Sequence, residues 1–276
     1  MDEYNNLVDI DYKYLKKIRE FIKIFKKELS HCNSNILKEN LKTLKIIKRR
    51  PLRDGKDIIY ASYEALNNVI YIFRGKYIFH ELLHMATTVK NKDNIIHIGF
   101  ACVDLNRKIK IGARINEGYT MLLTNRYFNN FLKSYKYYQI ETHFMYMLEI
   151  ILERNTLEKL YFEADFDRLI DLLLKYNSYE NIKSFVFDMD KIYKKENDGV
   201  IKNINNFLIE TYISKLSIYL ESGIIDAIGL ENNILKFIDD LCMIKINGKN
   251  NLQYIDLDNI EMKINLLNQK YIKRKK

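Results

Sequence analysis

The sequence from Lys76 to Thr88 reads KYIFHELLHMATT and holds two histidines four positions apart. The apolar residues of this segment would stand on most sides of a helix, and they include Phe79, Leu82, Leu83 and Ala86. A helix that is apolar around most of its circumference is usually buried. Residues four apart lie one turn above each other on the same helix face. We therefore expect His80 and His84 to present their rings together, with Glu81 beside them.

This His-Glu-x-x-His pattern is typical of sites that bind a metal ion through both rings and use the glutamate to act on water. The alternative is a pair of hydrogen-bonded core histidines beside a paired carboxylate. Burying His80, Glu81 and His84 on one helix is costly unless each side chain finds a partner. A shared cation gives both rings a partner at once, so the pattern favours a metal site.

A catalytic zinc site built on two histidines needs a third protein ligand and one open position. Glu117 is the favoured donor, because it stands near the start of a helix predicted over residues 116–132. Gly118 beside it would let the two helices approach closely. Two alternatives stay open: Glu117 as a first-turn acid favoured by the helix dipole, and His97 as the third ligand.

These residues resemble the gluzincin metallopeptidases, the thermolysin-like branch of the zincins. In that family a His-Glu-x-x-His helix is followed by a helix that carries a glutamate zinc ligand, often as Asn-Glu. His80, Glu81 and His84 match the first element, and Asn116 with Glu117 matches the second. The resemblance implies a zinc-dependent peptidase that holds Zn²⁺ through the two histidines and Glu117. It also implies that Glu81 is the general base, which takes a proton from water and passes it to the leaving amine.

The resemblance covers roughly residues 55–130 and includes a strand. The run from Asn68 to Phe73 is similar to the zincin edge strand, which receives an extended peptide. Gluzincins commonly carry an acidic residue four positions after the glutamate ligand, where it orients a zinc-bound histidine. This chain has Met121 there, so another group must orient the ring, or the site is weakened or inactive. An oxyanion donor is also expected, and the residues near enough in sequence are Tyr119, Arg126, Tyr127 and His97.

The expected fold is α+β and zincin-like, with a small mixed sheet, the His-Glu-x-x-His helix and a mainly helical C-terminal region. Apolar spacing predicts helices over 12–29 and 34–41, the second capped by the Ser34 hydroxyl. Strands are predicted over 43–49, 57–63, 68–73, 95–103 and 108–115, with a break at Pro51 and Asp54–Gly55. From residue 137 onward the spacing is helical, with breaks near 177–178, 196–199, 223 and 247–250. Three segments are expected: 1–54, a helical segment packed on the core; 55–132, the catalytic core; and 133–276, a helical subdomain.

Composition excludes several other classes of protein. The 276 residues are 47% hydrophobic and 29% charged, which predicts a folded chain. No uncharged apolar run reaches the roughly 18 residues of a membrane span. Residues 1–30 show no signal peptide, so a cytoplasmic location is expected. Cys32, Cys102 and Cys242 stand far apart, which favours reduced, mostly buried thiols over disulfides or a cysteine metal knot.

The net charge of +9 comes from 45 Lys and Arg against 36 Asp and Glu. The basic residues are scattered and no nucleic-acid-binding module accompanies them, so no specific nucleic-acid role is expected. The expected partner is a peptide or protein substrate. Three other functions stay open: a narrow-specificity regulatory protease that cleaves one intracellular partner, a catalytically inactive zincin-fold interaction protein, and a basic nucleic-acid binder. Neither the substrate nor the oligomeric state follows from the sequence.

Overall fold

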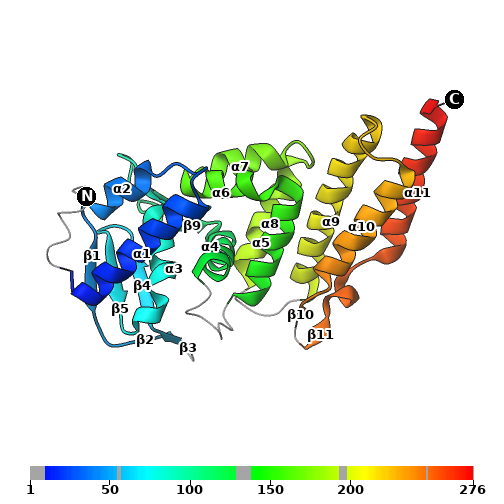
Figure 1. Ribbon diagram of the computed structural model, residues 1–276. Coiled ribbons are helices and arrows are strands. Elements are labelled where there is room, and N and C mark those ends of the chain that lie inside the picture. Colours follow the sequence, from blue (N-terminus) through cyan, green and yellow to red (C-terminus); the bar gives the residue numbers. More distant parts are fainter. Residues whose placement is uncertain (1–9, 55–56, 129–137, 193–197, 247, 276) are drawn as a thin grey trace. The chain divides into compact units, whose positions relative to one another are not determined.

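The computed structural model describes residues 10–54, 57–128, 138–192, 198–246 and 248–275 (Figure 1). Contacts divide the chain into two compact units: Met1–Thr142 with Arg154–Leu169, and His143–Glu153 with Ile170–Lys276. The expected mixed α+β class is confirmed, with small sheets and a mainly helical chain. The zincin-like fold and the three predicted segments stay predictions.

The first unit begins with two helices, α1 (Tyr12–Glu28) and α2 (Asn35–Leu41). Asp11 caps α1 by accepting a hydrogen bond from the backbone N–H of Lys13. The predicted cap of α2 is wrong, because the Ser34 side chain makes no capping hydrogen bond. Oδ1 of Asn33 accepts the N–H of Asn35 instead. The apolar stripe of α1 is buried as its spacing predicts, through Tyr14, Ile18, Phe21, Ile22 and Phe25.

A three-stranded sheet follows, with the strand order β1 (Lys45–Lys48), β5 (Val69–Ile72), β4 (Ala61–Glu64). Strand β5 pairs in parallel with β1 and antiparallel with β4. The prediction that residues 68–73 form an edge strand is therefore wrong, because β5 is central. Its side chains Val69, Ile70 and Ile72 are buried, which is typical of a strand covered on both faces, whereas β4 is only half-buried. The strand predicted over 57–63 is two strands, β3 (Asp57–Ile59) and β4, and β3 pairs antiparallel with β2 (Leu52–Asp54), where the sequence predicted a break.

The predicted metal-binding segment forms a short 3₁₀ turn, η1 (Gly75–Tyr77), and the helix α3 (Ile78–Ala86). Every residue of α3 is buried. The helix ends before its predicted limit because Thr88 already begins a second sheet, an antiparallel meander of β6 (Thr88–Lys90), β7 (Ile95–Ile98), β8 (Ala101–Asp104) and β9 (Ile109–Ile111). The strand predicted over 95–103 is two strands, because Gly99 turns the chain with a φ of +51°.

Helix α4 (Ala113–Phe128) packs against α3 and begins three residues before its predicted start. Aromatic rings join the helices of this unit: Phe79 stacks on Phe128, and Phe25 meets Phe162 of α6 (Arg154–Phe162) edge to face. Gly118 does allow a close approach, but to the first turn of α5 (Gln139–Leu152), where a Cβ would stand 2.6 Å from the carbonyl oxygen of Glu141.

The second unit is helical, as predicted from residue 137 onward. It includes the C-terminal part of α5 and of α7 (Phe166–Leu173). Four further helices follow: α8 (Tyr179–Lys191), α9 (Asp198–Glu221), α10 (Ala227–Leu241) and α11 (Leu257–Lys275). The predicted breaks near 177–178, 223 and 247–250 are confirmed, and the last of them is a hairpin of β10 (Lys245–Ile246) and β11 (Lys249–Asn250) followed by η4 (Asn251–Tyr254). The break near 196–199 lies partly outside the described residues. No helix among the described residues is long and apolar enough to cross a membrane.

Candidate metal centre

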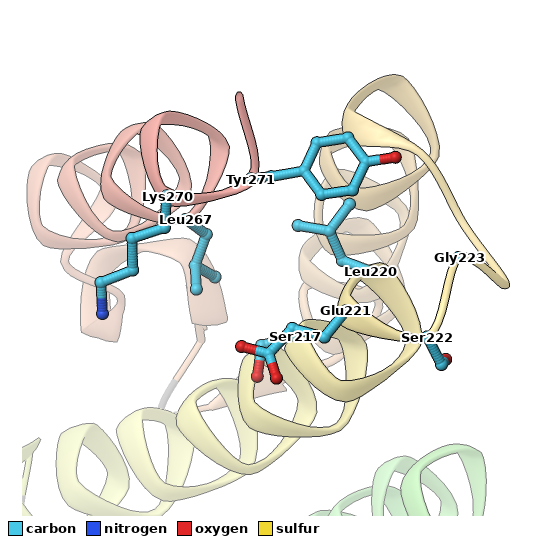
Figure 2. A pocket seen from close by; sticks show the side chains of 8 residues that line it. All are labelled: Ser217, Leu220, Glu221, Ser222, Gly223, Leu267, Lys270 and Tyr271. Atoms are coloured by element: carbon cyan, nitrogen blue, oxygen red, sulfur yellow. The ribbon is translucent and has the colours of Figure 1, made fainter. Parts of the chain in front are cut away.

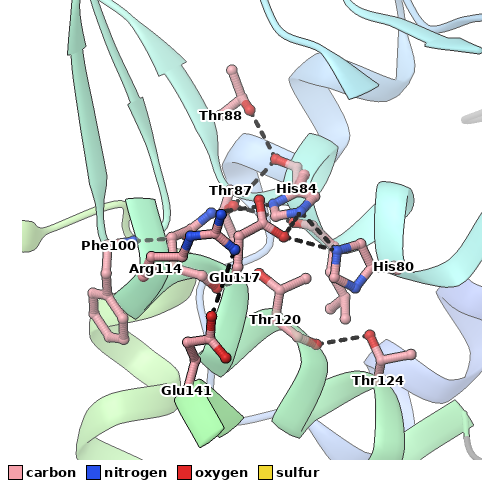
Figure 3. Close-up of polar contacts among 12 residues, drawn as sticks. His80, His84, Thr87, Thr88, Phe100, Arg114, Glu117, Thr120, Thr124 and Glu141 are labelled. Atoms are coloured by element: carbon pink, nitrogen blue, oxygen red, sulfur yellow. Dashed lines mark hydrogen bonds and ion pairs between the residues drawn. The ribbon is translucent and has the colours of Figure 1, made fainter. Parts of the chain in front are cut away.

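Three side chains from two helices converge in the first unit (Figure 3). Nε2 of His80 and Nε2 of His84, both on α3, lie 3.0 Å apart. Oε2 of Glu117, on α4, lies 3.2 Å from Nε2 of His80 and 3.5 Å from Nε2 of His84. The structure thus brings together the three residues that the sequence predicted as ligands.

These separations fit a zinc ion. Ligand atoms that each lie about 2.0 to 2.2 Å from a tetrahedral ion stand roughly 3.3 to 3.6 Å from one another. The three observed distances, 3.0, 3.2 and 3.5 Å, agree with that geometry to within about 0.3 Å. The two histidines are buried and the Glu117 side chain is 22% exposed. One carboxylate and two imidazoles form the donor set of a catalytic zinc site with an open position.

Glu81 is buried on the same helix. Burial raises the pKa of its carboxyl to about 7, and the charge of Glu117 adds to the rise. The charge of His80 and a backbone hydrogen bond from Tyr63 of β4 act in the opposite direction. A carboxylate whose pKa lies near neutral pH is suited to accept a proton and give it back.

Glu117 is held in its ionised form. Burial alone would raise the pKa of its carboxyl, but the charges and hydrogen bonds of His84 and His80 outweigh burial and keep that pKa well below its usual range. An ionised carboxylate is the form that binds a metal ion.

The two ligand rings differ in their outer partners. Asn116 lies against the His84 ring, with Nδ2 3.3 Å from Nδ1, while its Oδ1 accepts the backbone N–H of Phe100. Nδ1 of His80 is buried and has no hydrogen-bond partner within the described residues. Met121, at the position where gluzincins carry an acid, is a buried apolar side chain, 1% exposed. The chain therefore has an apolar residue in place of the acid at position 121, and among the described residues Nδ1 of His80 has no hydrogen-bond partner.

Sequence reasoning missed a second polar group beside the cluster. Nη1 of Arg114, one turn before Glu117 on α4, lies 3.5 Å from Oε1 of Glu141. The Arg114 guanidinium also lies over the ring of Tyr138, 5.2 Å from its centroid. Burial, and then the charge of Glu117, raise the pKa of the Tyr138 hydroxyl, and the charge of Glu81 adds to the rise. Arg114 could have been found from the sequence, because it lies three residues before Glu117 and so on the same helix face. Nothing in the sequence distinguishes Tyr138 from the other tyrosines, of which the chain has 21 in all.

The structure places the other predicted residues elsewhere. His97 lies on β7 opposite Cys102 of β8 and belongs to no cluster of ligand atoms among the described residues. Tyr119 is fully buried in an aromatic cluster with Phe100 and Tyr161. The side chains of Arg126 and Tyr127 bind Oε1 of Glu158.

The second unit contains a cavity of about 410 Å³ between α9 and α11 (Figure 2). It is lined by Ser217, Leu220, Glu221, Ser222, Gly223, Leu267, Lys270 and Tyr271. These residues bring together no set of metal ligands or paired catalytic groups, so the cavity adds nothing to the candidate site.

In three comparisons, no known protein family, curated protein or solved structure matches this chain. A function for the chain is therefore inferred from the geometry of the site.

Proposed function

We propose that this protein is a zinc-dependent peptidase of the gluzincin type. The observation that carries the proposal is the convergence of His80, His84 and Glu117, whose ligand atoms lie 3.0 to 3.5 Å from one another. The buried carboxyl of Glu81 beside them adds the group that peptide hydrolysis needs.

Each of these four side chains has its own role in the proposed reaction. His80, His84 and Glu117 would hold the ion, which when bound would lower the pKa of water toward neutrality and polarise a carbonyl. Glu81 accepts the proton of the attacking water and delivers it to the leaving amine. Its burial on the same helix as His80 and His84 supports this role.

Strand β4 supports a peptide as the substrate. It lies at an edge of its sheet, and the backbone of Tyr63 on this strand bonds to Glu81. An extended peptide that adds to a sheet edge is held by main-chain hydrogen bonds, which fix its register. We infer that the substrate pairs with β4, which would bring its scissile bond to the catalytic glutamate. In this proposal the edge strand that receives the substrate is β4 and not β5.

Tyr138 is the best donor for the oxyanion. Its hydroxyl is neutral at pH 7, as tyrosine hydroxyls ordinarily are, and burial and the charge of Glu117 raise its pKa further. A neutral donor close to the ligand carboxylate can stabilise negative charge that develops on the substrate carbonyl oxygen. Arg114, over the Tyr138 ring, would position it.

A second function, a zincin-fold interaction protein without activity, is favoured by the unpartnered Nδ1 of His80.

Metal analysis combined with hydrolysis of a mixed peptide library tests the proposal. We expect zinc to bind to the wild type at this site, to be lost from it in His80→Ala and His84→Ala, and to be kept in Glu81→Gln. Hydrolysis should be lost in all three variants, because the amide of Glu81→Gln cannot accept a proton. Zinc binding without hydrolysis in the wild type would favour the interaction protein. Activity that survives in Glu81→Gln would overturn the mechanism.

A further inference from the structure

A second group of ligand atoms lies at the other end of helix α4 and is independent of the proposed peptidase site. His31, Cys32 and Glu158 bring one nitrogen, one sulfur and one oxygen to within 4.8 Å of one another. His31 and Cys32 lie in the turn that follows α1, and Glu158 lies on α6. Arg126, which binds Glu158, is nine residues beyond Glu117 on α4, a rise of roughly 14 Å.

The two oxygens of the buried Glu158 carboxylate differ in their hydrogen bonds. Its side chain is 0% exposed. Oε1 accepts hydrogen bonds from Arg126 at 3.2 Å, from Tyr127 at 2.6 Å and from Arg154 at 3.0 Å. Oε2 is buried and accepts no hydrogen bond. The two arginines and Tyr127 bind one oxygen, and the second oxygen faces Nε2 of His31.

The contact between Glu158 and His31 has the distance of a hydrogen bond but not its geometry. Oε2 lies 2.8 Å from Nε2 of His31, and both atoms are buried without a hydrogen-bond partner. A hydrogen bond needs the oxygen close to the axis of the ring N–H. A metal ion shared by the two atoms lies on that axis itself, so the oxygen must lie off it. Two ligand atoms of one zinc ion stand roughly 3.3 to 3.6 Å apart, so an ion shared by these two atoms would separate them by about 0.5 to 0.8 Å more.

Cys32 supplies the third ligand. Its thiol is buried, 9% exposed, and it makes no disulfide. Thiolate, imidazole and carboxylate together form a donor set that binds zinc. The thiolate would also cancel part of the positive charge that an ion adds beside Arg126 and Arg154.

We propose that His31, Cys32 and Glu158 bind a second Zn²⁺, which joins the end of α1 to α6 and has water as its fourth ligand. The neighbouring edge-to-face contact of Phe25 with Phe162, at 4.9 Å between ring centroids, already holds these two helices together and fixes the positions of the ligands. An ion here would add metal–ligand bonds between the two helices to that apolar contact.

Metal content and cobalt absorption test this site separately from the proposed peptidase site. We expect two zinc ions in the wild type and one in each of two variants, the double variant His80→Ala, His84→Ala and the single variant Cys32→Ser. Loaded with Co²⁺, the wild type and the double variant should show the near-ultraviolet absorption of a thiolate bound to cobalt. Cys32→Ser should lack that absorption, because no other ligand in either cluster is a thiol.

Cys242→Ser is the matched control, since Cys242 belongs to neither cluster among the described residues, and it should keep both ions and the absorption. His31→Gln is a milder second variant that should also lose the second ion, so the test does not depend on the folding of Cys32→Ser. A double variant without metal, or an absorption that survives in Cys32→Ser, would overturn the proposal. A double variant that keeps one ion while the wild type hydrolyses no peptide would sustain this site and count against the peptidase.

Discussion

Nε2 of His80 and Nε2 of His84 lie 3.0 Å apart across one turn of α3. Nδ2 of Asn116 lies 3.3 Å from Nδ1 of His84, an arrangement that fits a neutral His84 ring with its proton on Nε2. Zn²⁺ would take the place of that proton, because a metal needs the lone pairs of both Nε2 atoms. The amide of Asn116 would then have to offer its oxygen to the new Nδ1 proton.

Glu117→Ala should weaken zinc binding at this site by more than about 100-fold, because even outer partners of metal ligands are commonly worth about 10- to 100-fold. The carboxylate is the only ligand that does not come from α3. Competition with a chromophoric chelator measures the affinity.

Glu141→Ala and His97→Ala are the matched controls for Glu117. Glu141 is a buried carboxylate on the neighbouring helix that binds Arg114, and His97 is the alternative ligand left open by the sequence. Both variants should keep the zinc. If His97→Ala loses the ion and Glu117→Ala retains it, the site holds three histidines and the gluzincin resemblance fails at its second element.

Met121→Glu should tighten zinc binding or raise peptidase activity by about 10-fold if its carboxylate reaches Nδ1 of His80. The opposing effect is the burial of a charge at a position that is now 1% exposed, which would lower the stability of the fold. Chelator competition reports the first effect and thermal melting the second. A folded variant that holds zinc no more tightly would show that this chain orients His80 in another way.

Tyr138→Phe should reduce kcat by about 10²- to 10³-fold, the usual effect of removing one oxyanion donor, and should leave zinc content unchanged. KM should change little, because the bond to the developing oxyanion is made in the transition state. Tyr127→Phe is the control, since the Tyr127 hydroxyl is bound to Glu158. Equal loss of activity in both variants would remove Tyr138 from the mechanism.

The sequence was sufficient to bring His80 and His84 together, because their spacing is itself geometric. Two residues four apart on a helix share a face whatever the rest of the fold does, so the spacing alone places His80 and His84 together. Apolar spacing likewise predicts helices α1 and α4 to within a few residues, since it marks their buried faces.

Other features depended on contacts distant in sequence. The central place of β5 follows from its parallel pairing with β1, which no local pattern encodes. The contact of Gly118 with Glu141 depends on how α5 approaches α4. Likewise, Glu158 becomes a partner of His31 only after α1 and α6 have packed, and for that reason the second cluster was not visible as a motif.

His143 in α5 should make the stability of the second unit depend on pH. Burial lowers the pKa of its ring below the ordinary value of 6.5, although the carbonyl of Leu241, which accepts a hydrogen bond from Nε2 at 3.2 Å, partly offsets the effect. As pH falls below about 6.5, the unfolded chain therefore binds a proton at this ring before the folded chain does. The free energy of unfolding should decrease as pH falls from that value through the lowered pKa, because the unfolded state binds more protons there.

Urea unfolding of the wild type and of His143→Gln, measured across this window, tests that prediction. The glutamine cannot take up a proton but can still donate a hydrogen bond to the Leu241 carbonyl. We expect the difference in unfolding free energy between the two proteins to be constant above about pH 7.5, where neither folded nor unfolded His143 is charged. Below about pH 6.5 the difference should move in favour of the variant, because only the wild type loses stability through this ring. A difference that stays constant down to the lowest pH at which both proteins fold would mean that folding leaves the pKa of His143 unchanged.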